Sequence, residues 1–211
     1  SLAQWPRCKP LRSRSAFRTG RQWCNERTGL GTAQRHSGGS PMTDFSNLPY
    51  RPNVGVALFN RDGKLFVARR ADLPGEIWQC PQGGIDEGED PRTAALRELA
   101  EETGCTRAAV LEERREWLAY DLPAELIGRA LGGKYRGQTQ KWFVLGFEGT
   151  DSDIRLDLHL PAEFDLWEWI EPEDLLQRNL GFKQELYEKL LPELKTLYQA
   201  ASSDWLRTNR A

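Results

Sequence analysis

The chain contains no long hydrophobic segment, although 39% of its 211 residues are hydrophobic. No apolar run approaches the 18 or more residues of a membrane-spanning helix, which argues against a membrane protein. Only four cysteines are present, and they form no CxxC pair: Cys8, Cys24, Cys80 and Cys105. No secretory hydrophobic region precedes them, so we expect a reducing, cytoplasmic compartment and no zinc site.

Histidine is equally scarce. The two histidines, His36 and His159, match no catalytic arrangement, and the chain shows no Ser/His/Asp or Cys/His signature. The sequence therefore gives no sign of a nucleophilic triad.

Positive charge is concentrated at the start of the chain. Residues 1–41 carry eight Lys and Arg against one acid, which leaves 21 basic and 30 acidic groups, a net charge of −9, to residues 42–211. Residues 1–45 lack periodicity and are interpreted as disordered or as an extension foreign to the native protein. A transit peptide and a basic arm that attracts RNA are the alternatives. We assign residues 46–200 to one folded domain and residues 201–211 to a C-terminal tail.

From Tyr50 onward, short patterned segments predict an α+β or α/β sandwich. Strands are expected at residues 53–60, 64–70, 77–80, 116–121, 141–148 and 164–170. An Arg-Asp-Gly turn joins the first two, as in a hairpin. Helices are expected at residues 91–103, 173–178 and 183–198, and Pro192 should kink or interrupt the last one.

The most informative stretch runs from Gly83 to Cys105 and reads GGIDEGEDPRTAALRELAEETGC. Asp90 is a natural N-cap, and Pro91 suits the first helical position. Gly104 suits the left-handed position just past a helix C-terminus. These residues predict the helix at 91–103.

Three glutamates, Glu98, Glu101 and Glu102, fall on one side of this helix. Like charges three or four residues apart destabilise a helix by roughly 0.2–0.5 kcal/mol per pair, so we expect a partner that offsets the repulsion. Oxygen ligands converging from one side suit Mg²⁺ or Mn²⁺. A solvated acidic face is the alternative for a bare ExxEE pattern, but the glycine, glutamate and arginine at fixed offsets favour a metal site.

These residues resemble the Nudix box, which in that family reads G-x5-E-x7-R-E-U-x-E-E-x-G-U, where U is a bulky aliphatic residue. Every fixed position is met. Cys105 stands where Ile, Leu or Val is usual, and because buried cysteine is a small hydrophobe, this departure concerns packing. The resemblance implies a mixed sheet between helices, an α/β/α sandwich. It also implies metal-dependent hydrolysis of a nucleoside diphosphate linked to another group, with Mg²⁺ or Mn²⁺ as the cofactor.

The resemblance further implies roles for the residues of the box. Glu98 and Glu102 would be metal ligands, together with the backbone of Gly83. Glu101 would be a further ligand or the base that activates water. Arg97 would orient a glutamate through a bidentate pair.

A second set of motifs narrows the branch of the family. The segments YRPNVG (50–55), WQCPQGG (78–84), GQTQKWF (137–143) and PAEFDLWEW (161–169) belong to this set. With the pair Phe182-Lys183, they resemble the branch that contains bacterial RNA 5′-pyrophosphohydrolases and asymmetrically cleaving dinucleoside tetraphosphate hydrolases. In that branch a glutamate of the segment at 161–169 completes the catalytic set. Glu163 is therefore our candidate for the distant base or an extra metal ligand, with an exposed loop glutamate as the alternative.

Further residues are candidates for substrate binding. The polyphosphate is expected to contact four polar side chains, which are candidates only as a set: Arg51, Gln138, Gln140 and Lys141. Phe182 is expected to stack on a base, with Lys183 beside it, and core packing at a helix start is the alternative for Phe182.

The expected activity is removal of pyrophosphate from the 5′ triphosphate end of RNA. Asymmetrical hydrolysis of diadenosine tetraphosphate to ATP and AMP is the alternative, followed by hydrolysis of free nucleoside triphosphates and by a binding module without catalysis. The partners are thus an RNA 5′ end or a dinucleoside polyphosphate. The sequence indicates no membrane partner and no obligate protein partner.

Overall fold

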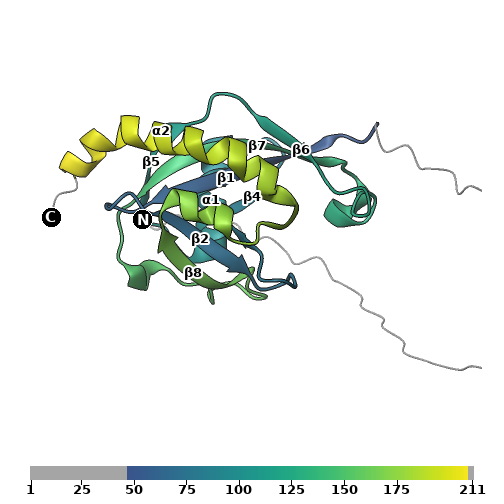
Figure 1. Cartoon of the computed structure of the whole chain (residues 1–211), viewed down its shortest axis with the longest axis horizontal. Helices are drawn as coiled ribbons and strands as arrows, with labels where there is room; N and C mark the ends of the chain where they lie inside the picture. Colours follow the sequence, from purple (N-terminus) through teal and green to yellow (C-terminus); the bar gives the residue numbers. More distant parts are fainter. Residues whose placement is uncertain (1–46, 209–211) are drawn as a thin grey trace, which may run out of the picture. The chain divides into compact units, whose positions relative to one another are not determined.

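The computed structural model describes residues 47–208 (Figure 1). The expectations for residues 1–45 lie outside this range. The strands are β1 (Tyr50–Phe59), β2 (Leu65–Arg70), β3 (Trp78–Gln79), β4 (Gln82–Gly84), β5 (Ala108–Glu113), β6 (Leu118–Asp121), β7 (Gly137–Phe147) and β8 (Phe164–Ile170). The α-helices are α1 (Pro91–Thr103) and α2 (Gln184–Thr208), and the 3₁₀ helices are η1 (Ala130–Gly133), η2 (Asp151–Asp153), η3 (Pro172–Gln177) and η4 (Gly181–Lys183).

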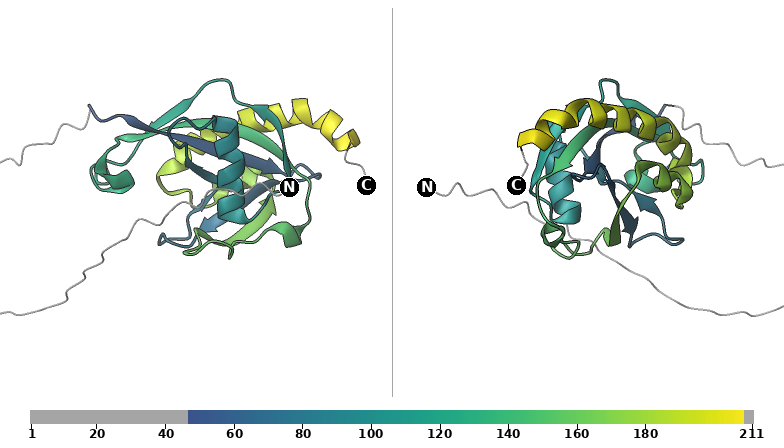
Figure 2. Two further views of the ribbon diagram at one scale, coloured as in Figure 1. Left: turned by 180° about the vertical axis from the view of Figure 1, so that it is seen from behind. Right: turned by 60° about the vertical axis from the view of Figure 1, so that its left-hand side comes forward.

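A mixed sheet forms the centre of the fold. β1 and β7 run parallel along their full length, with Tyr50 opposite Gly137 and Phe59 opposite Gly146. The sheet continues in the order β3–β2–β1–β7–β5, while β4 pairs with β1, β6 with β7 and β8 with β2. Seen from behind, α1 lies in front of the sheet and α2 passes behind it (Figure 2).

Alternation along the strands separates two hydrophobic layers, because successive side chains point to opposite faces. In β1, Val56 belongs to the layer that contains Leu99 of α1. Its neighbour Ala57 belongs to the layer that contains Leu190 of α2. The sheet is thus covered by a helix on each face, and the predicted α/β/α sandwich is confirmed.

The carboxylate helix α1 has the predicted bounds and the predicted caps. The Asp90 side chain accepts a hydrogen bond from the backbone N–H of Thr93, and Pro91 occupies the first turn. Gly104 adopts φ 70° and donates its N–H to the carbonyl of Ala100. Local sequence therefore fixes both ends of the helix that presents the glutamates.

Two strands were not predicted. Residues 82–84, expected as a loop, form β4 and pair antiparallel with β1. Residues 108–113 form β5, an edge strand on β7 with a register shift between Val110 and Glu112. This bulge breaks the strict alternation by which a half-buried strand is recognised. The helix expected at 173–178 is the 3₁₀ helix η3.

Helix α2 is longer than predicted. It continues through Pro192, so the expected interruption does not occur, and it extends to Thr208 into the segment that we assigned to a tail. Trp205 explains the extension, since its indole is 7% exposed and packs on Gly146, where a Cβ would lie 2.4 Å from the ring. Neither helix of the described range has the length and apolar character needed to cross a membrane.

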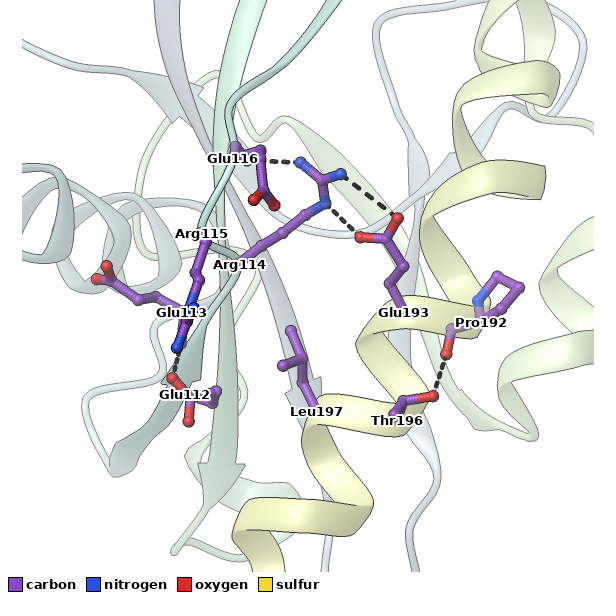
Figure 3. Close-up of a pocket in the computed structure, with 9 residues that line it drawn as sticks. All are labelled: Glu112, Glu113, Arg114, Arg115, Glu116, Pro192, Glu193, Thr196 and Leu197. Atoms are coloured by element: carbon purple, nitrogen blue, oxygen red, sulfur yellow. Dashed lines mark hydrogen bonds and ion pairs between the residues drawn. The ribbon is translucent and has the colours of Figure 1, made fainter.

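An ion pair joins α2 to the segment after β5. Arg114 donates to the carboxylate of Glu193 and to the carbonyl oxygen of Glu116 (Figure 3). A cavity of about 520 Å³ lies beside this pair, between residues 112–116 and α2. None of the residues that line this cavity belongs to α1, so the cavity is separate from Glu98, Glu101 and Glu102.

We predict that Trp205→Ala lowers the free energy of unfolding by about 3–5 kcal/mol, because it removes a buried aromatic side chain and leaves a cavity. Urea unfolding measures the change. Ser203→Ala, at an exposed position two residues away on the opposite side of the helix, is the control and should stay within about 0.5 kcal/mol of wild type. Equal stability of the Trp205 variant and the control would show that the end of α2 is not part of the core.

Candidate active site

Four carboxylates gather at one small cavity. Glu98, Glu101 and Glu102 project from α1, and Glu163 joins them from the segment before β8. The cavity has a volume of about 170 Å³ and is also lined by Leu156, His159 and Pro161. The candidates for ligands and base that the sequence indicated are thus brought together.

The guanidinium of Arg97 contacts three carboxylates and one backbone carbonyl. Its Nε and Nη2 contact the two carboxylate oxygens of Glu89 at 2.8 and 2.7 Å. Its Nη1 lies 2.8 Å from Glu98 Oε1 and 3.2 Å from Glu101 Oε2, and Nη2 also donates to the carbonyl of Gly84 at 2.8 Å. The hydrogen bond from Arg97 is the main reason that the pKa of Glu89 is lowered. The arginine therefore orients two glutamates of the cavity.

Two glycines make room for this arrangement. A Cβ on Gly83 would lie 1.9 Å from the carboxylate of Glu98, and a Cβ on Gly84 would lie 2.1 Å from Nη2 of Arg51. Any side chain at position 83 would thus displace Glu98. At position 84 it would displace the guanidinium of Arg51.

Glu102 is the most buried of the four acids, with 7% of its surface exposed. Its Oε2 accepts the backbone N–H of Gln82 at 3.0 Å, but its Oε1 has no hydrogen-bond partner. Burial raises the pKa of Glu102 well above the usual range, and the charges of Glu163 and Glu98 raise it further. Burial likewise raises the pKa of Glu98, against the opposing effect of Arg97.

These features fit a cation. A buried carboxylate oxygen without a partner, next to three further carboxylates, is a donor set that a divalent ion would satisfy. Within residues 47–208, no three acidic, histidine or cysteine side chains are already arranged around a common point as ligands. Two of the four acids, Glu98 and Glu101, are instead paired with Arg97.

The predicted substrate-binding residues separate into two groups. The guanidinium of Arg51 lies close to Gly84 of β4, and it forms no ion pair with another described residue. Phe182 is 45% exposed and contacts Tyr120, with 6.0 Å between ring centroids. A cavity of about 590 Å³ lies beside these two rings. Arg51 and Phe182 are therefore open to a ligand.

The others have their polar groups engaged within the protein. Gln140 is fully buried and bonds to the side chains of Asn53, Gln82 and Trp142. Lys183 is buried and donates to Gln79 and Gln82. Gln140 was expected to contact the polyphosphate and Lys183 to take part in substrate binding. Both expectations of direct contact are corrected, because the two side chains complete a buried amide network. Burial lowers the pKa of Lys183 to about 7.

Gln138 and Lys141 are also occupied. Gln138 is buried and accepts a hydrogen bond from the hydroxyl of Tyr120. Lys141 donates to the carbonyl of Arg115 and pairs with Glu113 at 3.3 Å, which directs its charge to the β5 side of the sheet. Neither residue lines the cavity of the glutamates.

Sequence reasoning missed some members of the site. His159 matched no motif, yet it lines the cavity, and its position four residues before Glu163 was the available signal. Gln82 holds Glu102 through its backbone N–H, a contact that side-chain chemistry does not reveal. Arg70 contacts Glu163 at 2.9 Å.

The similarities to known proteins agree with this geometry. The family model of the NUDIX domain matches residues 49–193. The chain is 69% identical over 170 residues to an RNA pyrophosphohydrolase of Gluconobacter oxydans (strain 621H), a match that covers 81% of this chain and 100% of that protein. It is 56% identical over 167 residues to an RNA pyrophosphohydrolase of Gluconacetobacter diazotrophicus, covering 76% and 100%. The solved dihydroneopterin triphosphate pyrophosphohydrolase of E. coli shares the fold, with a TM-score of 0.53 at 19% identity over 69% of this chain and 99% of that one.

We predict that Glu102→Gln raises the stability of the metal-free protein at pH 7 by roughly 1–3 kcal/mol, since it removes an uncompensated buried charge. The folded pKa of Glu102 lies above its unfolded value of about 4.3, so its neutral form is favoured in the fold. Its burial therefore costs nothing below pH 4 and destabilises the fold increasingly as the pH rises toward the folded pKa.

Urea unfolding in the presence of a chelator at pH 4 and pH 7 measures this difference. Glu112→Gln, at an exposed position of β5, is the control and should not change stability at either pH. A Glu102 variant less stable than wild type at pH 7 would contradict the prediction.

Proposed function

The chain belongs to the NUDIX family, and we propose that it is an RNA pyrophosphohydrolase that removes pyrophosphate from the 5′ triphosphate end of RNA and leaves a 5′ monophosphate. The observation that carries the proposal is the cavity where the glutamates of α1 meet Glu163. Similarity over the full length of two curated proteins of that name supports it.

A divalent cation, Mg²⁺ or Mn²⁺, is the cofactor that this donor set suits. Glu98, Glu101, Glu102 and the backbone of Gly83 would hold it, with Glu163 as a further ligand or as the base. When bound, such an ion neutralises phosphate charge, acts as a Lewis acid on phosphorus and makes a bound water more acidic.

The side chains around the cavity supply the remaining chemistry. The attacking water gives its proton to a carboxylate oxygen of Glu101 or Glu163, the two most exposed of the four acids. Arg97 keeps Glu98 in place through the hydrogen bond to its Oε1. The retained glutamates favour a catalyst over a module that only binds nucleotides.

Substrate recognition is expected at the 5′ end alone. We propose that the guanidinium of Arg51, close to Gly84, binds the polyphosphate and that a base stacks on the exposed ring of Phe182. Residues 42–211 carry a net charge of −9, from 21 basic and 30 acidic groups, so they have no extended basic footprint for RNA. The same features suit diadenosine tetraphosphate as the alternative substrate.

We also propose a cytoplasmic location. Cys80 and Cys105 are free thiols, as expected in a reducing compartment.

We predict that the protein with Mg²⁺ converts triphosphorylated RNA to a 5′ monophosphate end and that a chelator abolishes this turnover. One preparation is assayed on triphosphorylated RNA and on diadenosine tetraphosphate, with released pyrophosphate, ATP and AMP measured. Turnover of RNA lower by several orders of magnitude than that of diadenosine tetraphosphate would reverse the ranking of substrates. Near-normal hydrolysis by Glu98→Gln would remove α1 from the mechanism.

We predict different kinetic effects for alanine at two adjacent glycines. Gly83→Ala should lower kcat about 100-fold, because its Cβ displaces the carboxylate of Glu98. Gly84→Ala should raise KM roughly tenfold with a smaller effect on kcat, because its Cβ displaces the guanidinium of Arg51. Steady-state kinetics on the better substrate tests both variants, and each is the control for the other. Identical kinetic effects would refute the separate roles.

A further inference from the structure

Arg70 lies at an irregularity of the sheet next to the glutamate cavity. The pairing of β2 with β8 shifts register between Arg69 and Arg70, so that Arg70 lies opposite Phe164. The extra residue, Asp165, lies on β8. Along β2, Phe66 and Ala68 belong to the layer that contains Leu99 of α1, so alternation places Arg70 on that same face. The backbone N–H of Ala71 also donates to the carbonyl of Glu163 at 2.8 Å, which joins the two segments at this point.

The guanidinium of Arg70 bridges two acids. Its Nε and Nη2 donate to the two carboxylate oxygens of Asp72 at 2.8 and 2.7 Å. Its Nη1 lies 2.9 Å from Oε1 of Glu163. The Arg70 side chain is 17% exposed, against 52% for Asp72 and 36% for Glu163. Arg70 is therefore the least exposed of the three, with Asp72 on one side of its guanidinium and the cavity residue Glu163 on the other.

The neighbouring arginine behaves differently. Arg69 pairs with Asp165 at 2.8 Å and with Glu76 at 3.0 Å, and it contacts none of the cavity glutamates. Both arginines are thus paired with acids, but only Arg70 reaches an acid of the cavity. Arg69 is consequently a matched control on the same strand.

The position of Glu163 needs such a partner. Glu163 lines one small cavity together with Glu98 and Glu102, and like charges gathered in this way repel one another. A guanidinium fixed on its other side counters this repulsion. Asp72 in turn fixes the guanidinium through a bidentate pair, which leaves one edge for Glu163.

We propose that Arg70, anchored by Asp72, is a positioning residue that holds the carboxylate of Glu163 at the cavity during hydrolysis. The proposal rests on the role given to Glu163 in the proposed function. Arg70 itself touches neither the reacting phosphate nor the attacking water. Its effect on the reaction passes through Glu163.

A double-mutant cycle tests this proposal. Arg70→Ala should lower kcat between about 10-fold and 100-fold and change KM less than about twofold, because a misplaced group slows the chemical step. In a Glu163→Gln background, Arg70→Ala should change kcat less than about twofold, since the carboxylate on which it acts is already gone. Arg70→Lys should recover part of the rate, and Asp72→Asn should lower kcat in the same direction as Arg70→Ala. Arg69→Ala should leave both constants unchanged.

The cycle is run on triphosphorylated RNA, or on diadenosine tetraphosphate if RNA is not turned over, so that failure of the proposed substrate is distinguished from failure of this inference. A crystal structure of Arg70→Ala should show the Glu163 carboxylate displaced, and Arg70→Lys supplies the structure if the alanine variant does not fold. An effect of Arg70→Ala on KM alone would make Arg70 a substrate contact and overturn the inference. Additive losses in the cycle, a kcat unaffected by Glu163→Gln, or an unmoved Glu163 would also overturn it.

Discussion

Repulsion among four carboxylates is the constraint on which the site depends. Glu98, Glu101 and Glu102 occupy little more than one turn of α1, and Glu163 faces them across a cavity of about 170 Å³. Charges this close repel one another, most strongly around the buried Glu102, so the site needs counter-charges. The protein supplies arginines from two sides, Arg97 from the helix itself and Arg70 from the end of β2, while Oε1 of Glu102 remains without a partner. The unpaired oxygen marks where a bound cation would complete the charge balance.

Steric room matters as much as charge. Gly83 and Gly84 lie in β4, where any side chain would overlap either the carboxylate of Glu98 or the guanidinium of Arg51. The two glycines therefore let an acidic and a basic side chain approach the same short strand. Motifs rich in glycine are often read as flexible loops, but these two residues are part of the sheet and pair with β1. Their function here is close packing, because the absent Cβ atoms are what the neighbours occupy.

The sequence predicted the helix of the site, because contacts between nearby residues fix its ends. It did not predict which residues from other segments surround the helix. Asp90, Pro91 and Gly104 determine the ends of α1 through contacts within a few residues. In contrast, the burial of Gln140 depends on β7 starting at Gly137 and lying parallel to β1, a long-range register that no local pattern specifies. His159 and Arg70 reach the cavity through chain segments distant in sequence from α1. Residue types thus predicted the chemistry, whereas pairing between distant strands decided which side chains face the cavity.

A buried network of side-chain amides links Gln140 and Lys183 to the site. Lys183 donates to Gln82, Gln140 donates to the same side-chain oxygen of Gln82, and the backbone N–H of Gln82 holds Glu102. Buried polar groups that satisfy one another rigidify a core, because each would be costly without its partner. A substitution in this network would therefore shift the strand that supports Glu102 before it altered any direct contact with substrate. Gln140 and Lys183 thus support the carboxylate cavity from inside the fold, through Gln82, which explains their place in the motifs.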